Sequence, residues 1–208
     1  MIPHRTPFIL PLLYPSLTWR LPADQKRICL TFDDGPVYGP TEFVLETLKQ
    51  FNIRGTFFCI GDNIRKHPEV FQRIVHEGHA IGNHTFHHVK GWSTTVPDYL
   101  HEVDLCTQEI LKHDPKPVSL FRPPYGRIKR SQARQLSAYQ IIMWDVLSLD
   151  YNKSVSPDAC LQGTIRATRP GSVVVFHDSV KAEKNMVYAL PRFIEHFLER
   201  DYRFTLLS

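Results

Sequence analysis

The sequence contains few cysteines, and they stand far apart. Its 208 residues include only Cys29, Cys59, Cys106 and Cys160, and no two of them form a C-x-x-C pair. This spacing argues against a zinc site made of cysteines, because such sites typically use closely spaced cysteine pairs. Cys29 and Cys59 lie within apolar runs, where a free cysteine behaves as a small hydrophobic side chain. We therefore expect four reduced thiols, with Cys29 and Cys59 in the core.

Long hydrophobic runs and long basic runs are missing as well. The apolar stretch at residues 8–15 is too short and too interrupted by proline to span a membrane. No small-x-small cleavage site follows it, so a secretory signal is not evident, which favours a cytoplasmic protein and leaves export as the alternative. The formal net charge of +4 comes without a block of lysine or arginine, which argues against a nucleic-acid partner. We expect residues 1–26 to be an extended segment or a cap.

The rest of the chain alternates between patterns typical of strands and of helices. Strands are predicted at residues 27–33, 55–60, 80–83, 119–122, 140–146, 172–177 and 202–207. Helices are predicted at residues 41–51, 68–77, 97–113 and 185–200, the last kinked or started late by Pro191. Such alternation predicts parallel βαβ units, and seven strands indicate an incomplete barrel. With no linker or repeat, and with 42% apolar residues, residues 1–208 are expected to form one domain.

Two adjacent carboxylates, Asp33 and Asp34, stand at the end of the first predicted strand, directly before a Gly-Pro pair. Like charges this close repel each other, so the pKa of one carboxyl should rise unless a cation compensates. A metal ion would neutralise one carboxylate and leave the other free to act as a base. Taken alone, however, the D-G-P sequence is also ordinary turn chemistry.

Two histidines, His84 and His88, are candidate metal ligands. They are four residues apart, and on one helical turn this spacing makes two side chains face the same way. Two neutral imidazoles and one carboxylate are a common ligand set for catalytic zinc, with a further position open to water. Without other context, the two histidines could equally be exposed side chains at the start of a helix.

Several of these side chains are expected to meet. The ends of predicted strands carry Asp33, Asp34, His84, Arg122 and His177. In parallel barrels the active groups lie at the carboxyl ends of the strands. This placement predicts one shared site.

The order of the short motifs resembles that of the polysaccharide deacetylases of carbohydrate esterase family 4. Three family motifs are unaltered: T-F-D-D-G-P at 31–36, H-T-F-H-H at 84–88 and R-P-P-Y-G at 122–126. L-S-L-D-Y at 147–151 stands where the family has D-x-x-D-W, and V-F-H at 175–177 stands where it has L-x-H. The resemblance covers nearly the whole chain and implies a distorted (β/α) barrel, often with seven strands.

The resemblance also implies a reaction and a cofactor. Such enzymes hydrolyse the N-acetyl group of an N-acetylated carbohydrate of the GlcNAc type, and they use one divalent metal ion, which we expect to be zinc. By motif position, Asp34, His84 and His88 correspond to the metal ligands. His87 is not at a motif position, so we expect it to be structural or exposed.

Further roles follow from the same resemblance. Asp33 corresponds to the general base that activates water, and Arg122 to the residue that orients Asp33 and tunes its pKa. The backbone N–H of Tyr125 corresponds to a donor for the oxyanion. His177 corresponds to the general acid for the leaving amine, and Val175, at the start of the last motif, is a candidate substrate contact.

The fourth motif departs from the family pattern. Leu147 replaces the aspartate that usually partners the general acid, and Tyr151 replaces the tryptophan that usually walls the acetyl pocket. Asp150 matches the second aspartate of the motif, whereas Asp145 has the same strand parity as position 147. Either carboxylate, or none, could orient His177, and we favour Asp150.

This departure leaves other functions open. The same site could hydrolyse O-acetyl esters or non-sugar amides. A non-catalytic carbohydrate-binding or metal-binding remnant is the third alternative, but Asp33 argues against it because binding alone needs no base. The motifs identify neither the acetylated polymer nor the oligomeric state.

Overall fold

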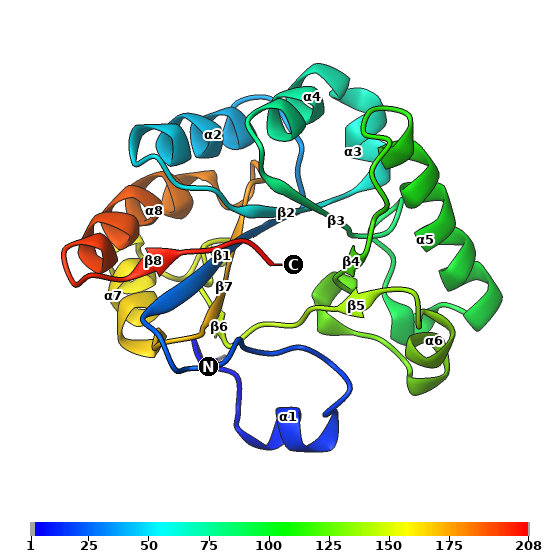
Figure 1. The fold of residues 1–208 in the computed structure, drawn as a ribbon, viewed down its shortest axis with the longest axis horizontal. Helices are drawn as coiled ribbons and strands as arrows, with labels where there is room; N and C mark the ends of the chain where they lie inside the picture. The colour runs from blue at the N-terminus through cyan, green and yellow to red at the C-terminus, as the bar shows by residue number, and fades with distance from the viewer. Residues whose placement is uncertain (1–2, 208) are drawn as a thin grey trace.

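A curled parallel sheet forms the centre of the computed structural model, which describes residues 3–207 (Figure 1). Seven strands follow one another in the order β5-β4-β3-β2-β1-β7-β6, and each neighbouring pair is parallel. Their bounds are β1 Arg27–Asp33, β2 Thr56–Cys59, β3 Ala80–Asn83, β4 Leu120–Phe121, β5 Gln140–Ile141, β6 Val146–Leu147 and β7 Val173–His177. A further strand, β8 (Arg203–Phe204), pairs with the start of β1 outside this series.

Helices surround the sheet on its outer side (Figure 1). Their bounds are α1 Ile9–Leu13, α2 Pro40–Gln50, α3 Gly61–Lys66, α4 Pro68–His76, α5 Val96–Leu111, α6 Arg130–Gln135, α7 Pro157–Ala167 and α8 Glu183–Leu198. Two 3-10 turns, η1 (Gly91–Ser93) and η2 (Pro124–Gly126), lie in the loops. Within residues 3–207, no helix has both the length and the apolar character needed to cross a membrane. The arrangement confirms the distorted, incomplete (β/α) barrel.

One predicted strand is wrong, because residues 140–146 form two strands at opposite ends of the sheet. The N–H of Ile142 donates to the carbonyl of Phe121 in β4, whereas the N–H of Asp145 donates to the carbonyl of Val173 in β7. Between these two residues the chain crosses the opening of the barrel. The predicted strand at residues 140–146 thus adds one strand to the series, as β5 and β6. The strand predicted at residues 202–207 is β8, which lies outside the series, so the series still has seven strands.

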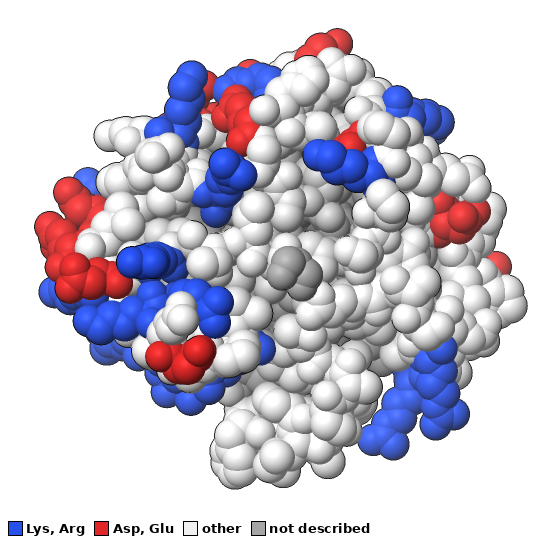
Figure 2. All heavy atoms as spheres, viewed as in Figure 1, with Lys and Arg blue, Asp and Glu red and all other residues white. Residues whose placement is uncertain are grey.

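The N-terminal segment fills the opening between β5 and β6. Thr18 forms an isolated bridge with Ile142, and Arg5 forms one with Val146. α1 projects from this segment as an uncharged lobe (Figure 2), on which Phe8 and other apolar side chains are exposed. Residues 3–26 therefore pair with the edges of the barrel and also contain one short helix.

The structure confirms all four predicted helices, as α2, α4, α5 and α8, within two residues at each end. α5 buries Tyr99, Val103 and Cys106 on one face, as the apolar pattern predicts. α8 begins at Glu183 and continues past Pro191, so the alternative of a late start is wrong. The prediction did not include α1, α3, α6 and α7. For α7 the signal was present, because Ser156 caps its N-terminus by accepting from the N–H of Ala159, and a proline follows at the first helical position.

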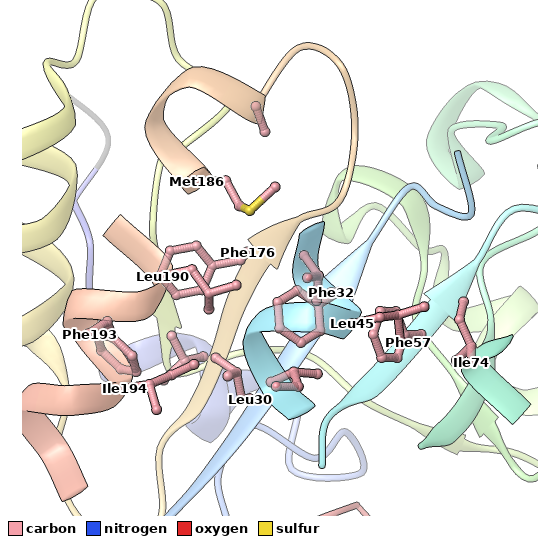
Figure 3. Close-up of a cluster of buried hydrophobic side chains, with 14 of the residues drawn as sticks. Leu30, Phe32, Leu45, Phe57, Ile74, Phe176, Met186, Leu190, Phe193 and Ile194 are labelled. Atoms are coloured by element: carbon pink, nitrogen blue, oxygen red, sulfur yellow. The ribbon is translucent and has the colours of Figure 1, made fainter. Parts of the chain in front are cut away.

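The main core lies between the sheet and the helices packed on it. In Figure 3, Phe32 and Phe57 from β1 and β2 lie near Leu45, while Phe176 from β7 faces Phe193 of α8. The ring centroids are 4.9 Å apart for Phe32 and Phe57, and 5.7 Å apart for Phe176 and Phe193. All four cysteines are buried and unpaired, as expected.

Replacing Phe193 by alanine should lower the free energy of unfolding by about 3–5 kcal/mol, because a fully buried ring is lost and a cavity remains. Urea unfolding measures this change. The matched control is Val187→Ala on the same helix, where 37% of the residue is exposed, and its effect should stay below about 1 kcal/mol. Equal losses in the two variants would contradict the packing described here.

Candidate active site

The carboxyl ends of the parallel strands bring the predicted site residues together. In the register between β1 and β7, Asp33 lies directly opposite His177. His84 follows β3, and Arg122 follows β4. The side chains of Asp33, Arg122 and His84 are almost completely buried at this edge of the sheet.

Asp34, His84 and His88 form a compact cluster of potential metal ligands. One ligand atom from each side chain lies within 4.8 Å of the others. Oδ1 of Asp34 is 3.2 Å from Nε2 of His88 and 3.8 Å from Nε2 of His84. One carboxylate oxygen and two imidazole nitrogens are a ligand set that suits a divalent metal such as zinc.

The proton positions in this cluster also fit a metal ion. Nδ1 of His84 lies 2.7 Å from the carbonyl oxygen of Arg122. Because a carbonyl can only accept, Nδ1 carries the proton and Nε2 presents its lone pair. Burial lowers the pKa of His84 to about 4, which keeps the ring neutral. Burial would raise the pKa of Asp34, but a hydrogen bond from His88 and the nearby histidine charges hold it below its usual range, so the carboxyl is ionised.

The two histidines lie on a loop, so the predicted helical turn is wrong. The backbones of Thr85 and His88 have φ values of 62° and 57°, which belong to the left-handed region. This loop brings the rings of His84 and His88 to a centroid distance of 5.1 Å. His87 points elsewhere, because its Nδ1 lies 2.9 Å from Oε1 of Glu102.

Arg122 holds Asp33 in a buried ion pair. Its Nη1 donates to Oδ1 of Asp33 at 2.6 Å and to Oγ1 of Thr31 at 2.8 Å. Its Nη2 donates to the carbonyl of Met143 at 3.0 Å. The guanidinium also lies over the ring of Phe58, 4.1 Å from its centroid. These contacts leave Arg122 one orientation, and Asp33 is positioned with it.

Asp150 partners His177. Nδ1 of His177 donates to Oδ1 of Asp150 at 2.8 Å, and the backbone N–H of His177 donates to Oδ2 at 2.7 Å. Burial alone would lower the pKa of His177, but the charge and hydrogen bond of Asp150 outweigh it and raise the pKa to about 9. His177 is therefore protonated at neutral pH and has an N–H to donate.

The alternative partner, Asp145, lies in a different network. It accepts from Arg169 Nη2 at 2.8 Å and from Ser172 Oγ at 2.7 Å, and Arg20 lies 3.5 Å away. These residues surround the start of β6, at the end opposite to the site. Strand parity alone did not reveal this, because Asp145 precedes the strand.

The remaining predicted residues differ in exposure. Tyr125 is half exposed, and its ring centroid lies 4.6 Å from that of His88. The ring of Tyr151 meets that of His177 at 4.9 Å. Val175 is fully buried in an apolar cluster with Leu147, against which Tyr151 packs. Because its side chain is buried, Val175 offers no surface for the predicted substrate contact and supports Tyr151 instead.

Two residues that sequence reasoning missed, Asp178 and Asn63, hold the loop after β1 that contains Asp34. Asp178 accepts from the N–H of Gly35 at 3.0 Å and from Oγ1 of Thr41 at 2.7 Å, and burial raises the pKa of its carboxyl to about 8. Nδ2 of Asn63 donates to the carbonyl of Asp34 at 2.7 Å. The only signal for Asp178 was an acidic residue directly after His177.

Comparisons with known proteins identify the family of this chain. Residues 20–144 match the family model described as polysaccharide deacetylase. A peptidoglycan-N-acetylglucosamine deacetylase of Bacillus cereus is 34% identical over 193 residues, which cover 89% of this chain and 68% of that protein.

Solved structures of the same family resemble this chain in fold. The crystal structure of the Bc1960 peptidoglycan N-acetylglucosamine deacetylase superposes with a TM-score of 0.90 at 30% identity, and the match covers 97% of this chain and 95% of that one. A mutant of BA3943, described as a pseudoenzyme of the CE4 family with restored enzymatic activity, superposes with a TM-score of 0.81 at 25% identity, over 91% of this chain and 68% of that one.

The metal content of two alanine variants tests the ligand cluster directly. Replacing His84 by alanine should abolish tight binding of one divalent ion, because one of three ligand atoms is lost. His87→Ala is the matched control and should retain the ion, since His87 contacts Glu102 instead. Elemental analysis after dialysis measures both. Retention in His84→Ala together with loss in His87→Ala would show that the ligands are assigned wrongly.

Proposed function

This chain belongs to the polysaccharide deacetylase family, and we propose that it is a metal-dependent hydrolase of N-acetyl groups on GlcNAc-containing poly- or oligosaccharides. The products are acetate and a free amine on the sugar. The observation that carries this proposal is the meeting of a carboxylate held by arginine, a three-ligand cluster and a protonated histidine at one edge of the sheet.

Asp34, His84 and His88 would hold the metal ion, and we propose zinc. A divalent ion bound there supplies polarisation of the acetyl carbonyl and a lower pKa for water. His84 and Asp34 are ready to bind, since one presents a neutral Nε2 and the other an ionised carboxylate. The half-exposed Tyr125 lies beside this cluster, and its backbone N–H is the proposed donor to the oxyanion.

Two residues transfer protons. Asp33 accepts a proton from the attacking water, and its ion pair with Arg122 holds the carboxylate in one position. As the bond between the acetyl carbon and the amide nitrogen breaks, His177 donates a proton to the departing nitrogen. Asp150 keeps His177 charged for this step.

The competing functions differ in what they require. A pseudoenzyme within the same fold family shows that the fold alone does not establish activity. The pairs Asp33–Arg122 and His177–Asp150 support catalysis here, because a binding module needs neither a base nor an acid. The acid also favours amides over esters as substrates, since an amine is the poorer leaving group and requires protonation.

Acetate release tests the function. The metal-loaded enzyme should release acetate from N-acetylglucosamine oligomers and less from acetylated xylan, which carries O-acetyl esters. Asp33→Asn should retain the metal but lose activity by about 10²–10⁴-fold, the range for loss of a general base. A variant at Asp33 that binds metal and stays fully active would refute the role of this residue. Greater release from xylan would favour the esterase alternative.

Asp150→Asn should move the basic limb of the pH–rate profile to lower pH. The negative charge of Asp150 raises the pKa of His177 to about 9, and the acid must be protonated to act. Removing that charge lowers the pKa of His177, so activity is lost at a lower pH. Asp145→Asn is the control, because its carboxylate lies at the other end of β6, and its basic limb should match the wild type. An unchanged limb in Asp150→Asn would mean that His177 works without this partner.

A further inference from the structure

A pocket with a volume of about 580 Å³ lies beside the proposed general acid. It is formed where the loop after β6 meets the loop after β7 and the start of α8, and Asp150 lines it. Its volume falls within the range of about 300–1,000 Å³ that is usual for ligand sites. It therefore adjoins the reaction site at the carboxyl end of the sheet.

Three lysines give this pocket a positive charge. Lys153, Lys181 and Lys184 all line it, and all three are exposed. Across residues 3–207, none of the three forms a salt bridge with a carboxylate. Glu183, next to them in sequence, does not line the pocket.

The one carboxylate in the lining does not neutralise these lysines. The side chain of Asp150 is completely buried, and both of its oxygens accept from His177. The carboxylate of Asp150 therefore interacts with His177 and forms no salt bridge with the lysines. Within residues 3–207, the ammonium groups of the three lysines that line the pocket have no acidic partner.

A row of side chains connects the lysines to the reaction site. Nζ of Lys181 lies 5.3 Å from the ring centroid of Tyr151. The same tyrosine ring meets the imidazole of His177 at 4.9 Å. The positive pocket is thus one aromatic side chain away from the group that protonates the departing nitrogen.

We propose that Lys153, Lys181 and Lys184 form a subsite for a carboxylate on the sugar adjacent to the N-acetyl group that is hydrolysed. The preferred substrate is then an acidic N-acetylated glycan instead of a neutral one. This inference rests on the proposed function and adds the charge of the substrate to it. Lysines suit the task because their ammonium groups are mobile point charges that follow a carboxylate on a flexible glycan.

Three substrates of equal length test the subsite with the metal-loaded enzyme. They are a neutral N-acetylglucosamine oligomer, an oligomer that alternates N-acetylglucosamine with lactyl-bearing N-acetylmuramic acid, and the methyl ester of the second. The wild type should prefer the acidic oligomer in kcat/KM by about tenfold, and esterification should remove most of this preference, because only the charge is lost. Added salt should weaken the preference.

A triple variant, K153Q/K181Q/K184Q, should reduce the ratio of kcat/KM between the acidic and neutral oligomers to near one. The control variant K49Q/K112Q/K116Q makes the same change in net charge at exposed lysines away from the pocket and should keep the wild-type ratio. A fourth oligomer, with stem peptides on the lactyl groups, identifies the source of the carboxylate. A preference for it that the triple variant loses assigns the peptide, and a preference for the free lactyl acid assigns the sugar.

The outcomes separate the two proposals. If the wild type releases acetate equally from neutral, acidic and esterified oligomers, the subsite is refuted and the deacetylase function stands. The same holds if the triple variant keeps the wild-type ratio. If no oligomer releases acetate, the proposed function fails, and the subsite fails with it.

Discussion

The buried ion pair between Arg122 and Asp33 is the interaction on which the site depends. A fully buried guanidinium without a counter-charge would cost several kcal/mol, and the carboxyl group of Asp33 is the partner that Arg122 has at this position. Arg122 also acts through its backbone, because its carbonyl oxygen fixes the proton of His84 on Nδ1 and leaves Nε2 free for a metal. One residue at the end of β4 therefore orients both the proposed base and a proposed ligand. A lysine could not do the same, since only a guanidinium can donate to Asp33, Thr31 and a carbonyl from one fixed plane.

The two adjacent aspartates avoid mutual repulsion because the fold gives them different partners. Asp33 points to Arg122, whereas Asp34 lies among the histidines, and its loop is tied down by Asn63. Directly across the register between β1 and β7, His177 is kept protonated by Asp150. The proposed base, Asp33, and the protonated acid, His177, thus face each other. An environment that raises the pKa of the acid, as Asp150 does for His177, suits proton donation at neutral pH.

Local sequence patterns predicted the parts of this arrangement that local physics determines. The bounds of β1 and β3 agree with the prediction, because short apolar runs bounded by turn residues define them. The split of residues 140–146 could not be predicted, since it depends on pairing with Thr18, far away in the sequence. The i,i+4 spacing of His84 and His88 is equally compatible with a helix and with a loop of left-handed residues, so the spacing identified the pair but not its backbone. Asp178 was missed because its role exists only through contacts with a different loop.

The altered fourth motif shows how a carboxylate can reach the acid when position 147 is apolar. Leu147 packs with Val175 and Leu149 in a buried cluster, and the ring of Tyr151 packs against this cluster. The backbone then turns at Leu149, whose φ of 61° lies in the left-handed region. This turn returns Asp150 to the end of β7, where both oxygens accept from His177. Because one of these bonds is to the backbone N–H, the carboxylate is held by the strand as well as by the ring. The leucine therefore does not deprive the acid of its counter-charge, which comes from a residue three positions later in the chain.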